Sequence, residues 1–183
     1  MDIVPEDIVD ILYSCIDEIG RERIRTEITS DIAASKKFCK EIIGRCRSKL
    51  GPGLDDETLA TICEATLHFM LTVSLLPSER KVNVRGMDLD IVIPSQRMLG
   101  RQPEKTLVVQ MIKKSNDIAK VKQAESVQPK HANIWTVSVK PVQTGHKNYH
   151  LDSENFSYID LISDINLFLL DSGVRGLKLL HGH

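Results

Sequence analysis

The spacing of apolar residues changes after about the first 80 residues of the chain. Before that point apolar positions recur three and four residues apart, as in amphipathic helices. This spacing predicts helices over residues 5–19, about 30–50 and about 55–75. Beyond it, short alternating or continuous apolar runs predict strands. They lie at residues 81–86, 88–94, 106–112 and 133–141, with helices at 115–128 and 156–172.

The order of these elements predicts an α/β fold. A hairpin followed by a strand that is reached through a helix implies a small mixed β-sheet with flanking helices. Polar stretches at 95–104 and 142–155 are predicted loops. We expect a helical N-terminal module over residues 1–53 and an α/β domain over 54–183, together forming one compact unit.

Charge is unevenly distributed along a chain whose net charge is −1. Residues 1–80 sum to −5, residues 81–147 to +7 and residues 148–183 to −3. A positive middle segment is typical of proteins that bind a phosphate backbone, although the same charges also suit a solvated surface. We therefore predict nucleic acid as a partner. The predicted phosphate contacts are Arg97, Arg101, Lys114, Lys120 and Lys122.

Other features of the sequence narrow the class of protein. No apolar run reaches the length of about 20 residues that spans a bilayer, and the N-terminus has no basic segment before an apolar one. We expect a cytoplasmic protein with no membrane partner. None of the four cysteines forms a C-x-x-C pair, which favours buried thiols over a zinc site.

Two acids begin an otherwise apolar predicted strand in the stretch GMDLDIVI. Asp88 and Asp90 are two residues apart, and alternation along a strand places them on one face. The next predicted strand ends in QMIKK, which contains Gln110, Lys113 and Lys114. Turn acids beside glycine and lysines at strand ends are also common without any catalytic role.

The order helix, strand, strand, strand, helix, strand over residues 55–140, with an acid on its second strand and a polar residue before lysine on its third, resembles the PD-(D/E)XK nuclease superfamily. This superfamily includes restriction endonucleases and archaeal Holliday junction resolvases. The resemblance implies a restriction-endonuclease-like core and Mg²⁺-dependent cleavage of DNA. It makes Asp90, Gln110 and Lys113 the catalytic residues, with Asp88, Asp90 and Gln110 as metal ligands and Glu64 as a candidate helix acid.

The residue types suit that chemistry, but their spacing departs from the family's. Mg²⁺ binds oxygen ligands, and a lysine stabilises charge on a phosphate. In the family the lysine comes two residues after the third-strand ligand, whereas Ile112 occupies that position after Gln110. A bulge near Met111 would bring Lys113 to the face of Gln110.

The alternative to an enzyme is a catalytically inactive, nuclease-like scaffold. Such a scaffold would be a non-enzymatic module that binds nucleic acid or protein, with the acidic N-terminal helices meeting a protein partner or a second copy of the chain. The chain contains none of the glycine-rich phosphate-binding motifs G-x-x-x-x-G-K-[ST] and G-x-G-x-x-G, and no G-x-S-x-G.

Overall fold

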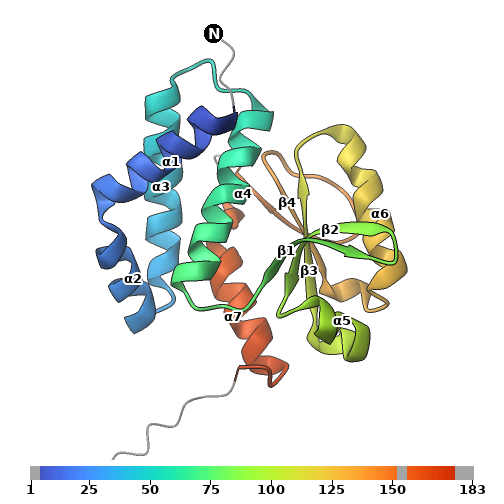
Figure 1. Cartoon of the computed structure of the whole chain (residues 1–183). Coiled ribbons are helices and arrows are strands. Elements are labelled where there is room, and N and C mark those ends of the chain that lie inside the picture. The colour runs from blue at the N-terminus through green and yellow to red at the C-terminus, as the bar shows by residue number, and fades with distance from the viewer. Residues whose placement is uncertain (1–4, 152–155, 176–183) are drawn as a thin grey trace, which may run out of the picture.

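A computed structural model describes residues 5–151 and 156–175 as a five-stranded sheet between two layers of helices (Figure 1). The strands are β1 (Glu79–Val84), β2 (Met87–Ile93), β3 (Leu107–Ile112), β4 (Ile134–Ser138) and β5 (Lys147–His150). The helices are α1 (Pro5–Ile19), α2 (Arg21–Ser30), α3 (Ala34–Leu50), α4 (Asp56–Val73), α5 (Gln96–Arg101), α6 (Ile118–Val127) and α7 (Leu161–Asp171). The predicted α/β class and the helical N-terminal part are confirmed.

The sheet is mixed, as predicted, and its strands follow one another in chain order. β1, β2 and β3 pair antiparallel, whereas β3, β4 and β5 pair parallel. The parallel step from β3 to β4 passes through α6, which packs on β2, β3 and β4. Helices α1 to α4 and α7 lie on the other side of the sheet (Figure 1).

The predicted helix over 55–75 is α4, and the sequence explains both its start and its burial. The Asp55 carboxylate accepts a hydrogen bond from Thr58 N at 2.7 Å, which satisfies one of the free amides of the first turn. Its apolar residues pack against α1, α3, α7 and β3. A helix covered on several sides can bury polar side chains too, and Glu64, Thr66 and His68 of α4 are buried.

Three elements differ from the sequence-based expectation. Gly20, at φ 101°, ends α1 as expected, but the chain resumes at once as α2. The predicted loop 95–104 contains α5, whose first turn is capped by the Ser95 hydroxyl accepting from Met98 N. The predicted loop 142–155 contains β5, a four-residue strand of mostly polar residues. Neither α5 nor β5 is long enough to show a clear period in the sequence.

The hairpin of β1 and β2 turns at Arg85 and Gly86, whose φ angles are 53° and 82°. Two consecutive positive φ angles are typical of the type I′ turn, whose twist matches that of the strands. Glycine adopts this conformation without steric cost. The turn therefore fixes which residues of the two strands face each other.

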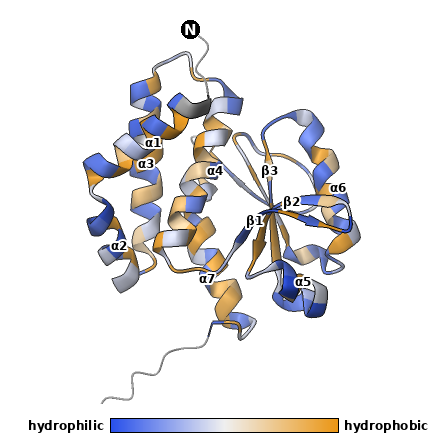
Figure 2. Ribbon diagram, in the orientation of Figure 1, coloured by the Kyte–Doolittle hydropathy of each residue, from blue (hydrophilic) through white to orange (hydrophobic). Residues whose placement is uncertain are grey.

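Apolar side chains form a separate core on each face of the sheet. The larger core joins α1, α2, α3, α4 and α7 to one face, and the smaller core joins α6 to the other (Figure 2). All four cysteines are buried free thiols, as expected. Within the described parts of the chain, no helix combines the length and hydropathy that a bilayer crossing requires.

Candidate functional site

The candidate site begins at an irregularity that the hairpin shows at Lys81 and Asp90. Leu89 packs in the core beside α6, whereas Ile91 packs in the core beside α4. Regular alternation would put both on one face. Lys81, opposite Asp90 in the hairpin register, has a φ of 50°, which is rare for a residue with a side chain. The hairpin is therefore twisted at this pair, and Lys81 and Asp90 both reach the side that α4 covers.

At the level of Asp90, hydrogen bonds to side chains replace the backbone pairing between β2 and β3. The backbone pairing of β2 with β3 covers Ile93 to Ile91 of β2 and stops there. Beyond it, Asp90 N donates to Gln110 Oε1 at 2.7 Å, and Met111 N donates to Asp90 Oδ2 at 2.8 Å. The two strands separate here, and each takes a side chain of the other as its hydrogen-bond partner.

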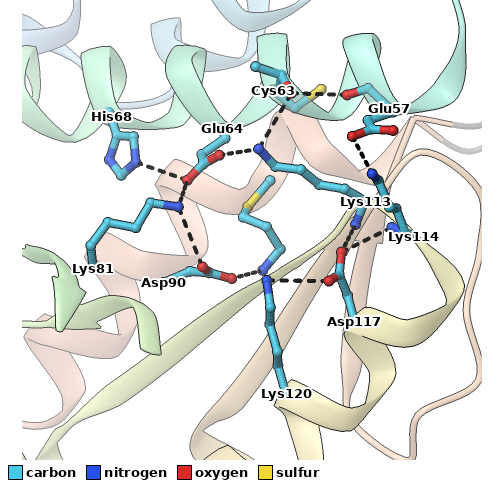
Figure 3. A network of polar contacts seen from close by, with 12 residues as sticks. Glu57, Cys63, Glu64, His68, Lys81, Asp90, Lys113, Lys114, Asp117 and Lys120 are labelled. Carbon is cyan, nitrogen blue, oxygen red and sulfur yellow. Dashed lines mark hydrogen bonds and ion pairs between the residues drawn. The ribbon is translucent and has the colours of Figure 1, made fainter. Parts of the chain in front are cut away.

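Five charged or ionisable side chains meet above this gap, and we call them the Glu64 cluster: Glu64, His68, Lys81, Asp90 and Lys113 (Figure 3). Glu64 projects from α4 and is its centre. Its Oε2 lies 2.6 Å from Lys113 Nζ, and its Oε1 lies 2.9 Å from Lys81 Nζ. Lys81 Nζ also lies 3.7 Å from Asp90 Oδ1, so this ammonium bridges the two carboxylates.

The carboxylates of the Glu64 cluster are buried, whereas one of its lysines is accessible. The side chains of Glu64 and Asp90 are 9% and 10% exposed, and that of Lys81 is 62% exposed. Solvent therefore reaches the two acids from the side of Lys81. The side chain of Lys113 is 25% exposed. It also donates a hydrogen bond to the Thr61 hydroxyl at 3.4 Å, so two residues of α4, Glu64 and Thr61, hold it.

The electrostatic balance of the cluster keeps Glu64 ionised. His68, Lys113 and Lys81 hold the pKa of the Glu64 carboxyl well below its usual value, although burial acts in the other direction. The two lysines make direct contacts, whereas His68 Nε2 is 3.9 Å from Glu64 Oε1, beyond hydrogen-bond distance. Burial lowers the pKa of Lys81, but Glu64 and Asp90 outweigh burial and raise it. Burial also lowers the pKa of His68.

The end of β3 is positioned by Asp117, in the turn that leads into α6. Asp117 Oδ2 accepts from both Lys113 N, at 2.9 Å, and Lys114 N, at 3.0 Å. This double contact fixes the backbone from which the Lys113 side chain extends toward α4. Lys120 Nζ lies 3.3 Å from the other oxygen of the same carboxylate.

The expected site of Asp90, Gln110 and Lys113 is not formed. Gln110 is fully buried and turns toward α6, where Nε2 donates to the carbonyls of Asp88 and Lys120 at 3.2 and 3.4 Å. Lys113 turns toward α4 instead. The side chains of β3 alternate regularly between the two cores from Leu107 to Ile112. The strand therefore has no bulge that would bring Gln110 and Lys113 to one face.

Asp88 also lies apart from Asp90, contrary to the expectation that the two share a face. Its carboxylate accepts from Asn83 Nδ2 at 2.7 Å, beside the turn of the hairpin, and the residue is exposed. The twist at Asp90 separates the two acids. Asp88 is thus a turn acid, as the non-catalytic interpretation of the sequence had it.

The residue two positions before Lys113 on its own face is Met111, which is buried in the larger core. The resemblance to PD-(D/E)XK nucleases expects an oxygen ligand at that position. A thioether is a soft donor and does not suit Mg²⁺. The cluster therefore offers two carboxylates. Within residues 5–151 and 156–175, no group of three or more His, Cys, Asp or Glu side chains is placed to hold a metal ion.

The predicted phosphate contacts are distributed over both faces of the sheet. Arg97 and Arg101 are exposed on α5, and Lys122 is exposed on α6, across the sheet from α4. Lys120 pairs with Asp117. Lys114 pairs with Glu57 of α4 at 2.8 Å, and Figure 3 shows Lys114 and Lys120 in the same network of polar contacts as the cluster.

The sequence analysis did not identify His68 and Lys81 as members of the cluster. Lys81 occupies an ordinary polar position of an edge strand, and no glycine or asparagine at that position indicates its positive φ angle. Glu64 was foreseen only through the family resemblance, because its neighbours on α4 are apolar. An acid within such an apolar helix is the sequence signal that could have identified it without the resemblance.

Comparison of the chain with protein-family models, with curated proteins and with solved structures found no match.

Proposed function

We propose that the protein is a Mg²⁺-dependent phosphodiesterase that acts on nucleic acid at the Glu64 cluster. The observation that carries this proposal is the meeting of a helix acid, a second-strand acid and a third-strand lysine where β2 and β3 separate. Buried acids that converge with lysines at a solvent-accessible point are typical of functional sites. The resemblance to PD-(D/E)XK nucleases supports the same assignment.

Glu64 and Asp90 are the residues that would hold the metal. Mg²⁺ commonly binds through one or two carboxylates and keeps several waters, so this pair fits it. When bound, the metal supplies a polarised phosphoryl oxygen and a more acidic water. Lys113 places a positive charge beside the two acids, where it stabilises negative charge that develops on a phosphate.

Lys81 balances the charge of the two acids when no other cation does so. Its ammonium lies between Glu64 and Asp90, which is the position a divalent cation would share with them. The side chain is long and mostly exposed, so it can leave without disturbing the core. In this proposal Lys81 turns outward and contacts the phosphate backbone.

The decisive experiment compares Asp90→Asn with Asp88→Asn in a cleavage assay on single-stranded and branched DNA at varied Mg²⁺ concentrations. An asparagine at position 90 still accepts from Met111 N, so the fold is preserved while the charge is lost. We expect Asp90→Asn to lower cleavage by about 100-fold or more, and Asp88→Asn, on the exposed turn, to leave it unchanged. Equal cleavage by both variants would contradict the proposal.

A non-enzymatic role is the second candidate, and two observations favour it. Met111 occupies the position of the third-strand ligand, and Lys81 and Lys113 together already balance the charge of the two acids. A scaffold of this kind would bind nucleic acid equally well with Mg²⁺ or with EDTA and would never cleave it. Met111→Asp separates the candidates, because a third carboxylate should tighten Mg²⁺ binding, measured by calorimetry, only if Glu64 and Asp90 take part in it.

A further inference from the structure

A cavity of about 440 Å³ lies between α1, α4 and the start of β1, next to the Glu64 cluster. The His68 ring belongs to both, because it lines the cavity and contacts Glu64. Arg80, which precedes Lys81 in β1, also lines it. The cavity therefore continues the candidate site toward the helical layer.

The wall of the cavity combines aromatic and cationic groups. Tyr13 of α1 is 43% exposed, and Phe69 of α4 lines the same cavity. The Arg21 guanidinium lies 5.0 Å from the centre of the Tyr13 ring and pairs with Asp17. Among the residues that the structure describes, no carboxylate lines the cavity.

Arg80 is the cation of this wall that has no counter-charge. Within the described part of the chain no Asp or Glu lies within ion-pair distance of its guanidinium, and the residue is exposed. Arginine binds phosphate through paired donors, and aromatic rings stack on nucleobases. A ligand that suits the whole wall thus needs a flat aromatic part and an anionic part.

We infer that this cavity binds one nucleotide, with the base against Tyr13 and Phe69 and a phosphate on Arg80. The inference rests on the proposed function, since it places a nucleotide of the substrate beside the acids that would act on the neighbouring linkage. The same chemistry is present in a free mononucleotide and in the end of a single strand. A cavity of this volume is within the range of small-molecule sites.

The test measures the binding of AMP, of a short single-stranded oligonucleotide and of the same oligonucleotide with one abasic end, all in EDTA. Tyr13→Ala removes the stacking surface, and Arg80→Gln removes the phosphate contact. We expect each to weaken binding about tenfold. Leu167→Ala, an exposed apolar residue on α7, and Arg25→Gln, an exposed arginine on α2, are the matched controls and should bind as the natural chain does.

The outcomes separate this inference from the proposed function. AMP binding as tight as that of the oligonucleotide identifies a free nucleotide as the ligand, and weaker AMP binding identifies a strand end. If the Asp90→Asn variant no longer cleaves DNA but still binds the oligonucleotide in EDTA, the cavity binds its ligand independently of the metal. Binding that is unchanged by Tyr13→Ala and Arg80→Gln, or equal for the abasic strand, would overturn the inference even if cleavage is observed.

Discussion

At the scale of single residues, Glu64 is the side chain on which most of the candidate site depends. It is nearly buried and contacts two lysines that come from different strands. A buried carboxylate of this kind stabilises the fold only while it stays ionised and paired. Its removal leaves Lys113 without its short contact on α4.

We expect Glu64→Gln to lower the free energy of unfolding by roughly 1–3 kcal/mol at pH 7. The pKa of Glu64 is depressed in the folded state, so its contribution is present above the unfolded value of about 4.3 and is lost as the pH falls through the lower, folded value. Urea unfolding between pH 3 and pH 7 should show the natural chain and the variant converging in acid.

Glu57→Gln is the control for that series, because Glu57 pairs with Lys114 on the surface of the same helix. Exposed pairs contribute little, about 0–1 kcal/mol. The role given to Glu64 would be contradicted if Glu64→Gln lowered the free energy of unfolding no more than Glu57→Gln does. It would also be contradicted if the loss did not diminish in acid.

Gln110 joins β2 to β3 through its side-chain amide, so its replacement is expected to change stability. Gln110→Met keeps the volume but leaves Asp90 N and the Asp88 carbonyl without their partners. We expect a loss of roughly 1–3 kcal/mol in the free energy of unfolding. Gln123→Met, at an exposed position of α6, should change it by less than about 0.5 kcal/mol. Full stability of Gln110→Met would show that β2 and β3 do not need this amide.

At the scale of elements, the hairpin of β1 and β2 decides where Asp90 lies. The strands of this hairpin, β3, β4 and α4 were predicted from the spacing of their apolar residues. The face of the sheet on which Asp90 lies was not predicted. Side chains alternate between the two faces only in a regular strand, and no short sequence pattern indicates the twist at Lys81. Hydrogen bonds between distant residues, such as Asp90 and Gln110, are likewise not encoded in any short stretch.

Gly86→Ala tests the turn. The position has a φ of 82° and open space around it, so an added methyl group meets no atom and the cost comes from the backbone alone. We expect a loss of about 1 kcal/mol in the free energy of unfolding, measured by thermal or urea denaturation. Gly44→Ala, inside α3 with similar space, should instead gain about 0.5–1 kcal/mol. The same sign for both changes would contradict the assigned turn conformation.

At the scale of the whole molecule, one apolar core joins the N-terminal helices to the sheet. Ile16 of α1, Ile42 of α3 and Val109 of β3 belong to the same buried cluster. A chain that starts at residue 54 would expose the faces of α4 and α7 that α1 and α3 now cover. The boundary at residue 53 therefore falls between two helices, α3 and α4, that pack in one core.

We expect the segment 54–183 alone to lose cooperative unfolding, because its apolar face has no cover. Circular dichroism on heating should show a broad, shallow change in place of a sigmoidal one, with binding of a hydrophobic dye at low temperature. A sharp transition close to that of the full chain would show that the helical layer is a separate module.

The bridge that Lys81 makes between Glu64 and Asp90 has a consequence for selectivity among ions. A tethered ammonium competes with dissolved cations at an effective concentration set by its own chain, in the millimolar range for short flexible tethers, and dilution does not remove it. Monovalent ions at lower concentrations are excluded, since they offer the two acids no more charge than Lys81 does. Under the proposal that Glu64 and Asp90 hold Mg²⁺, a divalent ion offers the two acids twice that charge, which favours it over a monovalent ion in replacing the lysine.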